Sequence, residues 1–187
     1  MNIFYLHEDP KLAASYVYDK HKVKMILESA QMLCTAHHVY GNGHNVPYKQ
    51  AHLNHPSTIW TRENTHHYYW LYLHMLALGD EYTKRYGKHH LSIQKCAEPL
   101  LRPPSEMPTK KFEQPPQCMP DHYKQPFAIH GYWRYYIGDK SKICNKNETP
   151  YTIETIPENV IDMYYSGADR YNKLSSYNVP CIPITSG

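Results

Sequence analysis

The sequence has few of the features that mark secreted, membrane or disulfide-rich proteins. Its 187 residues include no apolar run of about 18 residues and no charged leader followed by an apolar segment. We therefore expect no membrane span and no signal peptide. The five cysteines are odd in number and form no Cys-x-x-Cys pair. This pattern argues against a disulfide scaffold and favours a reducing, cytoplasmic compartment.

Several common catalytic motifs are also missing. The chain contains no phosphate-cradling Gly-rich loop, no Gly-x-Ser-x-Gly elbow and no dinucleotide-binding fingerprint. These absences leave nucleotide hydrolysis and serine hydrolysis without support. The formal net charge is only +3, so bulk charge does not by itself indicate nucleic-acid binding.

Tyrosine and histidine are the abundant residues, with 19 and 14 copies. Both carry a flat ring with a polar group, and histidine becomes cationic below a pH of about 6.5. A surface rich in them could stack on bases and contact phosphates. The alternative is that an AT-biased genome encodes many tyrosines, histidines, asparagines, lysines and isoleucines.

Two long helices dominate the predicted secondary structure. The first is predicted over residues 10–39, because Asp9-Pro10 is a favourable start and Gly41 follows its end. The second is predicted over residues 56–86, with Gly87 as the terminating residue. We expect Val23, Ile26, Ala30, Leu33 and His37 to form the core stripe of the first helix, with Asp19 on the same stripe.

The rest of the chain is predicted to be helical or proline-rich. Eight prolines between Pro99 and Pro126 exclude regular helix or central strand there, so this strap is either wrapped over the domain or partly mobile. The predicted class is mainly α, in a single compact domain over residues 1–187. Its further parts are a strand or packed arm at 1–6, a shorter helix at 91–102, and C-terminal helices within 127–175, including 126–142 and 157–174.

The charged run Asp19–Met25 is the first candidate for chemistry. A carboxylate on a core stripe is costly unless it is paired or used. Lysines beside it could bind phosphate, or one could act as an amine nucleophile. The alternative is a solvated basic helix face. The residues of this cluster are Asp19, Lys20, His21, Lys22, Lys24 and Glu28.

A second candidate is the segment His52-x-x-His55-Pro56, which is followed by Trp60 and Arg62. The two histidines have spacing that could ligate a metal, but no second pair completes a site, and we predict no metal. Because Pro56 opens a helix, His55 could instead lie beside a bound phosphate. His55 could equally be a helix cap, with Trp60 in the core.

A third candidate is the stretch 132–140, in which aromatic and basic residues alternate. Such interleaving suits base stacking with phosphate contact, through Trp133, Arg134, Tyr136 and Lys140. An aromatic core helix with an exposed arginine is the alternative interpretation, and it would bury Trp133, Tyr136 and Ile137.

Four spaced patterns in the N-terminal half point to a known family. They are Phe4-Tyr5-Leu6, Asp19…Lys24…Glu28, Tyr48…His55-Pro56…Trp60…Glu63 and Glu81-Tyr82…Arg85-Tyr86-Gly87. Together they resemble the pyrimidine-dimer DNA glycosylase superfamily, and most closely its uncharacterised phage and bacterial relatives. The stretch 132–140 is similar to the aromatic-basic C-terminal stretch of the archetypal phage enzyme. The resemblance covers residues 1–90 and 130–142.

This resemblance implies a small helical DNA glycosylase with lyase activity, acting on a damaged or modified base in double-stranded DNA. In the family an N-terminal α-amine attacks the sugar C1′ to form a Schiff base, and a helix-borne glutamate assists. Here Asn2 is bulky enough for Met1 to be retained, so the amine of Met1 would serve. Asp19 or Glu28 would take the carboxylate role, with Lys24 beside them. No cofactor is implied, and a phage protein would act in the host cytoplasm.

Three functions are compatible with these observations. The first is a base-excising enzyme that holds an extruded base among Trp60, Tyr68, Trp70, Trp133 and Tyr136. The second is a non-catalytic nucleic-acid-binding protein on the same scaffold. The third is a phage interaction protein that uses the strap as its surface. A free nucleotide is also a possible substrate of a lysine- and histidine-rich pocket.

Overall fold

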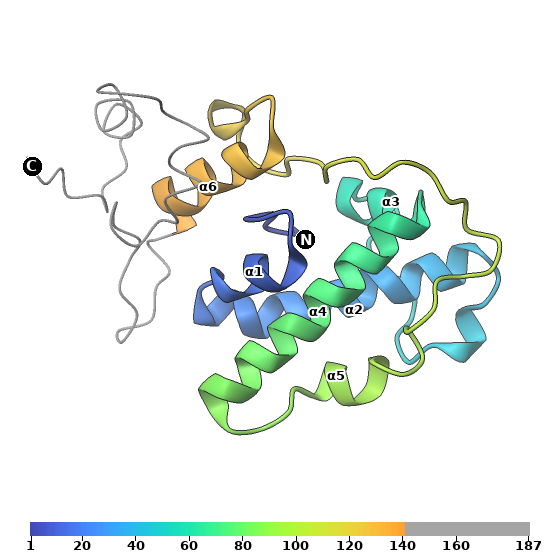
Figure 1. The fold of residues 1–187 in the computed structure, drawn as a ribbon. Coiled ribbons are helices and arrows are strands. Elements are labelled where there is room, and N and C mark those ends of the chain that lie inside the picture. The colour runs from blue at the N-terminus through green and yellow to red at the C-terminus, as the bar shows by residue number, and fades with distance from the viewer. Residues whose placement is uncertain (141–187) are drawn as a thin grey trace, which may run out of the picture. The chain divides into compact units, whose positions relative to one another are not determined.

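The computed structural model describes residues 1–140, which form six α-helices and no strand (Figure 1). This confirms the predicted mainly α class. The chain divides into two compact units, Met1–Cys118 and Met119–Gly187. Organisation as a single domain stays a prediction, and the helix expected at 157–174 lies outside the described residues.

The first predicted long helix is in fact two helices, α1 (Pro10–Ser15) and α2 (Asp19–Val39). Asp9 begins α1 as expected, because its Oδ1 accepts hydrogen bonds from the backbone of the first turn. The prediction of one continuous helix is wrong at residues 16–18. Tyr16, Val17 and Tyr18 are weak helix formers, and Tyr18 is extended, with ψ of 150°. Burial of Val17 and Tyr18 stabilises the break.

The second predicted long helix is also divided, into α3 (Pro56–Arg62) and α4 (Thr65–Tyr86). The break occurs at Asn64, whose Oδ1 accepts from the backbone N–H of His66 and so caps α4. Asparagine competes with helix continuation in this way, and the continuous helix was a wrong prediction for that reason. The end at Gly87 is confirmed, since its φ of 68° suits glycine.

In the first unit, α2 and α4 pack against each other and the shorter helices cover them (Figure 1). Helix α1 packs on α4, α3 contacts both long helices, and α5 (Leu91–Cys96), shorter than the predicted 91–102, does the same. Residues 1–6 contain no strand and form a packed arm in which Ile3, Phe4, Tyr5 and Leu6 are at most 3% exposed.

The core stripe of α2 is largely as predicted, with Ile26, Ala30, Leu33 and His37 buried. Val23 is the exception, because it is 38% exposed. The inward position one turn after Asp19 is taken instead by Lys22, whose side chain is 13% exposed. Its ammonium lies 3.6 Å from Asp19 Oδ1 and 3.9 Å from Glu81 Oε2, so charge pairing decides which side chain turns inward.

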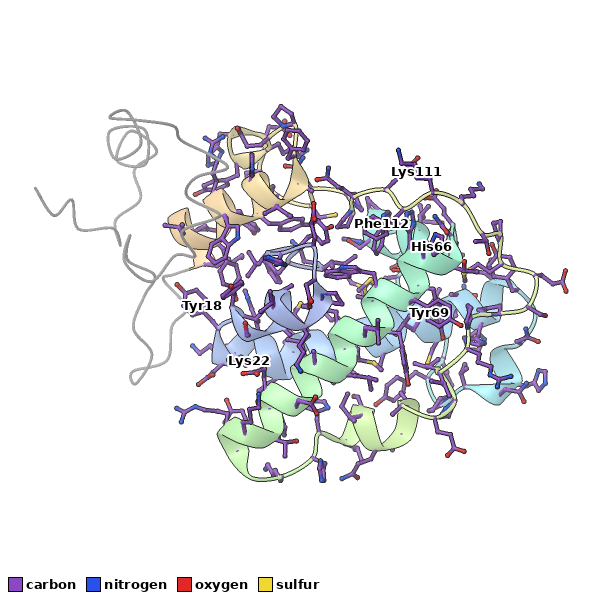
Figure 2. All side chains as sticks on the ribbon, viewed as in Figure 1. Tyr18, Lys22, His66, Tyr69, Lys111 and Phe112 are labelled. Atoms are coloured by element: carbon purple, nitrogen blue, oxygen red, sulfur yellow. The ribbon has the colours of Figure 1, made fainter. Side chains whose placement is uncertain are left out.

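The part of the strap in the first unit, residues 99–118, is fastened to the start of α4 (Figure 2). Asn64 Nδ2 donates to the carbonyls of Lys110 and Lys111, and its Oδ1 accepts from Lys110 N–H. Glu113 is held through both backbone groups, because its N–H donates to His67 Nε2 and its carbonyl accepts from Trp60 Nε1–H. These hydrogen bonds satisfy backbone groups of the strap, because a proline-rich segment cannot form a regular series of backbone hydrogen bonds.

The second unit is described as far as Lys140 and contains η2 (Asp121–Tyr123) and α6 (Ala128–Gly138). The described helix begins two residues after the predicted start at Pro126. Trp133, Tyr136 and Ile137 are buried, as expected for an aromatic core helix. Tyr123 packs on Gly138, where a Cβ would lie 2.8 Å from its ring.

Acidification is expected to weaken the fold through His74 on α4. This side chain is 1% exposed, and burial lowers its pKa to about 4. An unfolded histidine titrates near 6.5, so the stabilisation of the fold by neutral His74 is complete above that pH. It is lost as the pH falls towards 4, and the total loss in unfolding free energy is about 3 kcal/mol. Denaturant unfolding of wild type and His74→Leu between pH 7 and 4 tests this.

The Leu variant should show a shallower loss of stability on acidification. His44→Leu, at an exposed position, should keep the wild-type pH dependence. Equal slopes for wild type and His74→Leu would show that His74 does not carry the effect.

Candidate active site

The chain begins beside a carboxylate of α2. The α-amine of Met1 lies 3.8 Å from Glu28 Oε2, and Lys24 Nζ lies 3.4 Å from Glu28 Oε1. The carboxyl side chain is only 12% exposed, whereas that of Lys24 is 66% exposed. Because Lys24 and Glu28 are one turn apart on one helix, the helix fixes their spacing. Three of the four predicted catalytic residues are therefore brought together.

His55 lies in the same neighbourhood and caps α3. Its Nδ1 accepts from Ser57 N–H at 3.1 Å. Burial lowers the pKa of His55, the charge of the α-amine lowers it further, and Glu28 opposes the shift. Because Nδ1 is occupied as the acceptor of the bond from Ser57 N–H, the neutral imidazole carries its proton on Nε2 and can act there as a hydrogen-bond donor.

Asn2 and Thr58, neither of which was predicted as a site residue, hold the start of the chain. Asn2 Oδ1 accepts from Ile3 N–H, and Asn2 Nδ2 donates to Cys118 O, each at 2.8 Å. Thr58 Oγ1 lies 3.7 Å from Met1 Sδ. Thr58 follows the His55-Pro56 pattern, and this pattern was the only feature of the sequence that indicated a place for Thr58 near the site.

Glu28 has a buried oxygen on the side of the α-amine. Its Oε2 is buried and accepts no hydrogen bond from the residues that the structure describes. A buried acceptor left without a hydrogen bond is costly, and such groups concentrate where chemistry needs them. The oxygen that faces the α-amine is therefore available to take a proton.

Asp19 belongs to a different cluster. Nine residues separate it from Glu28, a rise of about 13 Å along an α-helix. Its Oδ2 accepts from Arg85 Nε at 2.6 Å, and its Oδ1 lies 3.6 Å from Lys22 Nζ. Of its neighbours, Lys20 is exposed, while His21 is buried and stacks on Phe4 with ring centroids 4.3 Å apart. The charged residues of α2 thus belong to two separate clusters, one around Asp19 and the other around Glu28.

The predicted binding residues of α3 have structural partners. Trp60 is 5% exposed, and it stacks on His67 at 4.3 Å between ring centroids. Arg62 Nη1 donates to Leu53 O at 2.7 Å. The Trp60 and Arg62 side chains thus link α3 to the strap and to the preceding loop.

The predicted binding residues of the second unit differ in exposure. Trp133 is 1% exposed and Tyr136 is fully buried. Arg134 and Lys140 are half-buried. Lys140 Nζ lies 4.7 Å above the centre of the Tyr135 ring and 3.8 Å from Asp139. The two aromatic side chains are thus core residues, and the two cations are partly exposed.

Residues 1–140 contain no group of three His, Cys, Asp or Glu side chains arranged for a metal ion. In the same range, no helix combines the length and apolar character needed to cross a bilayer.

Comparison with known proteins gives one match. A family model described as pyrimidine dimer DNA glycosylase matches residues 1–94, which is half of the 187-residue chain. Neither a search of curated proteins nor a search of solved structures found a match. The matched residues include the arm, α2, His55 and all of α4.

Proposed function

Because this chain belongs to the pyrimidine dimer DNA glycosylase family, we propose that it excises a base from double-stranded DNA by amine chemistry and then cleaves the abasic strand. The observation that carries this proposal is the α-amine of Met1 beside the buried, hydrogen-bond-free oxygen of Glu28. An amine and a carboxylate at this spacing suit Schiff-base formation and proton transfer.

The proposed reaction begins when the neutral amine attacks C1′ of the damaged nucleotide. A C1′–N bond to the protein forms, and the glycosidic bond breaks with its electron pair leaving on the base, which takes up a proton. The deoxyribose ring then opens as its oxygen is protonated, which gives a protonated imine. Loss of a proton from C2′ expels the 3′ phosphate and cleaves the strand.

Each nearby group has a role in this scheme. Glu28 accepts the proton that the amine loses, returns it to the ring oxygen as the deoxyribose opens, and is then free to take the C2′ proton. Lys24, exposed beside it, faces solvent and can contact a DNA phosphate, as can the exposed Lys20 one turn earlier. His55, whose Nδ1 accepts from Ser57 N–H, can donate a hydrogen bond from Nε2 to a group bound near the amine.

Borohydride trapping with a duplex that carries one abasic site tests the proposal. The expected result is a covalent protein–DNA adduct, mapped by mass spectrometry to the N-terminal peptide, with the intact mass showing that the chain starts at Met1. A variant extended by Gly-Ser before Met1 moves the amine by about 7 Å and should form no adduct.

Three results would contradict the proposal in different ways. An adduct mapped to Lys24 would identify another nucleophile. Salt-sensitive DNA binding without any adduct would indicate a non-catalytic DNA-binding protein. Absence of DNA binding at low salt would exclude both base excision and non-catalytic DNA binding as functions.

A further inference from the structure

The side chain of Met1 is buried, although chain ends are usually loose and exposed unless something ties them down. Only 1% of this side chain is exposed, whereas the residue as a whole is half-buried. The accessible part of Met1 is therefore its backbone, which carries the α-amine. Met1 thus keeps its side chain inside the protein while its amine stays within reach of a substrate.

Helix α3 supplies a contact that holds the Met1 side chain. Thr58 is fully buried, and its Oγ1 donates to Met1 Sδ at 3.7 Å. A thioether sulfur is a weak acceptor, so the removal of apolar surface from water contributes more than this bond. Thr58 follows His55 by three residues at the start of α3, so this helix fixes both the side chain of Met1 and the imidazole near the amine.

Asn2 fixes the backbone that follows Met1. This residue is 8% exposed, and its Oδ1 accepts from the backbone N–H groups of Ile3, at 2.8 Å, and Phe4, at 3.4 Å. Its Nδ2 donates to Cys118 O at the end of the first unit. The peptide after Met1 is therefore held by the arm itself and by the strap.

These contacts together determine the direction of the α-amine. The amine and the side chain are both bonded to the Cα of Met1, and Asn2 holds the next residue. Rotation about the Cα–C bond of Met1 is then the main freedom left to the amine. That rotation would also move the side chain away from Thr58, so burial of the side chain opposes it. The amine consequently stays 3.8 Å from Glu28 Oε2.

We propose that the side chain of Met1 is a positioning group, whose burial against α3 holds the α-amine beside Glu28 for attack at C1′. A reacting group held in one orientation avoids an entropic cost, and a misplacement of about 1 Å can slow a reaction about 100-fold. This inference rests on the proposed function, because it concerns the amine that reacts there. It adds that an α-amine alone is insufficient, so removal of Met1 would inactivate the enzyme.

Chains that begin with a chosen residue test the inference, and a fusion cleaved directly before residue 1 provides them. Single-turnover borohydride trapping is measured with saturating abasic-site DNA. Met1→Ala keeps an α-amine at the same position in the chain but lacks the buried side chain, and its trapping rate should fall at least about tenfold. A chain that begins at Asn2 moves the amine by about 3.6 Å, and its rate should fall about 100-fold or more.

Two controls separate positioning from a general loss of stability. Met1→Leu restores an apolar side chain of similar volume, and its rate should be within about threefold of wild type. Met107→Ala truncates another buried methionine, which is 5% exposed and lies in the strap, and it should keep the wild-type rate even where its stability falls. Urea unfolding and DNA affinity, measured on the same samples, should show that Met1→Ala folds and binds DNA as wild type does.

Equal trapping rates for wild type and Met1→Ala would overturn the positioning role and leave the proposed function intact. An equal loss of rate in Met1→Leu, or in Met107→Ala, would also overturn it, because burial of the Met1 side chain would then not be the cause. If Met1→Ala does not fold, Met1→Val, which removes less of the side chain, takes its place in the comparison. Absence of an adduct with wild type would reject the amine mechanism, and the positioning role with it.

Discussion

Replacing Glu28 with glutamine should slow adduct formation with abasic-site DNA by about 100-fold or more, the usual scale of general acid–base catalysis. Glutamine keeps the shape of the side chain but cannot accept the proton that the α-amine loses. Because Oε2 of Glu28 accepts no hydrogen bond from the described residues, the change breaks few structural contacts. Single-turnover trapping time courses, with denaturant unfolding of the same samples, measure the effect.

Two matched carboxylates serve as controls for that change. Glu81→Gln alters another partly exposed helical glutamate paired with lysines, Lys22 and Lys84, and should leave the trapping rate near wild type. Asp19→Asn removes charge from the Arg85 pair and should lower stability more than rate. A large rate loss in Asp19→Asn, with the fold intact and Glu28→Gln fully active, would move the carboxylate role to Asp19.

Replacing Asn64 with alanine should cost about 3 kcal/mol of unfolding free energy, because a helix cap and several strap bonds are lost together. Asn64 is 1% exposed, and its side chain makes four hydrogen bonds, two of them to the carbonyls of Lys110 and Lys111. Urea unfolding measures the loss. Trypsin should also cut after Lys110 and Lys111 faster than in wild type.

Asn64→Asp separates the cap from the strap bonds. Aspartate can still accept from His66 and Lys110 N–H, but it cannot donate to the two carbonyls, so its stability should fall between wild type and Asn64→Ala. Asn45→Ala, at an exposed site, should be near neutral. Unchanged stability in Asn64→Ala would mean that the strap contributes little to the first unit.

The sequence predicted the fold best where local chemistry alone decides it. The start at Asp9-Pro10 and the end at Gly87 follow from capping and from a left-handed residue, and both are confirmed. The cap of Asn64 on His66 N–H is also local, but it was missed in the sequence. The contacts that reinforce the two breaks, namely the burial of Val17 and Tyr18 and the bonds from Asn64 to the strap, form only when the chain has folded.

The candidate site, too, could be predicted only where local spacing along the chain determines it. Lys24 and Glu28 are one turn apart, so their proximity follows from helix geometry. Asp19 was the favoured carboxylate because it lies on a core stripe, but its partner Arg85 is 66 residues away and could not be read from spacing. Likewise, nothing in the sequence places Cys118 beside Asn2.

The bond from Asn2 Nδ2 to Cys118 O joins the beginning of the chain to the last residue of the first unit. During synthesis, Cys118 leaves the ribosome after Met1, so the start of the chain lacks this anchor until the whole unit is made. A fragment limited to residues 1–94 would keep Glu28 and lack this anchor. The amine that we propose as the nucleophile thus gains this anchor only when the first unit is complete.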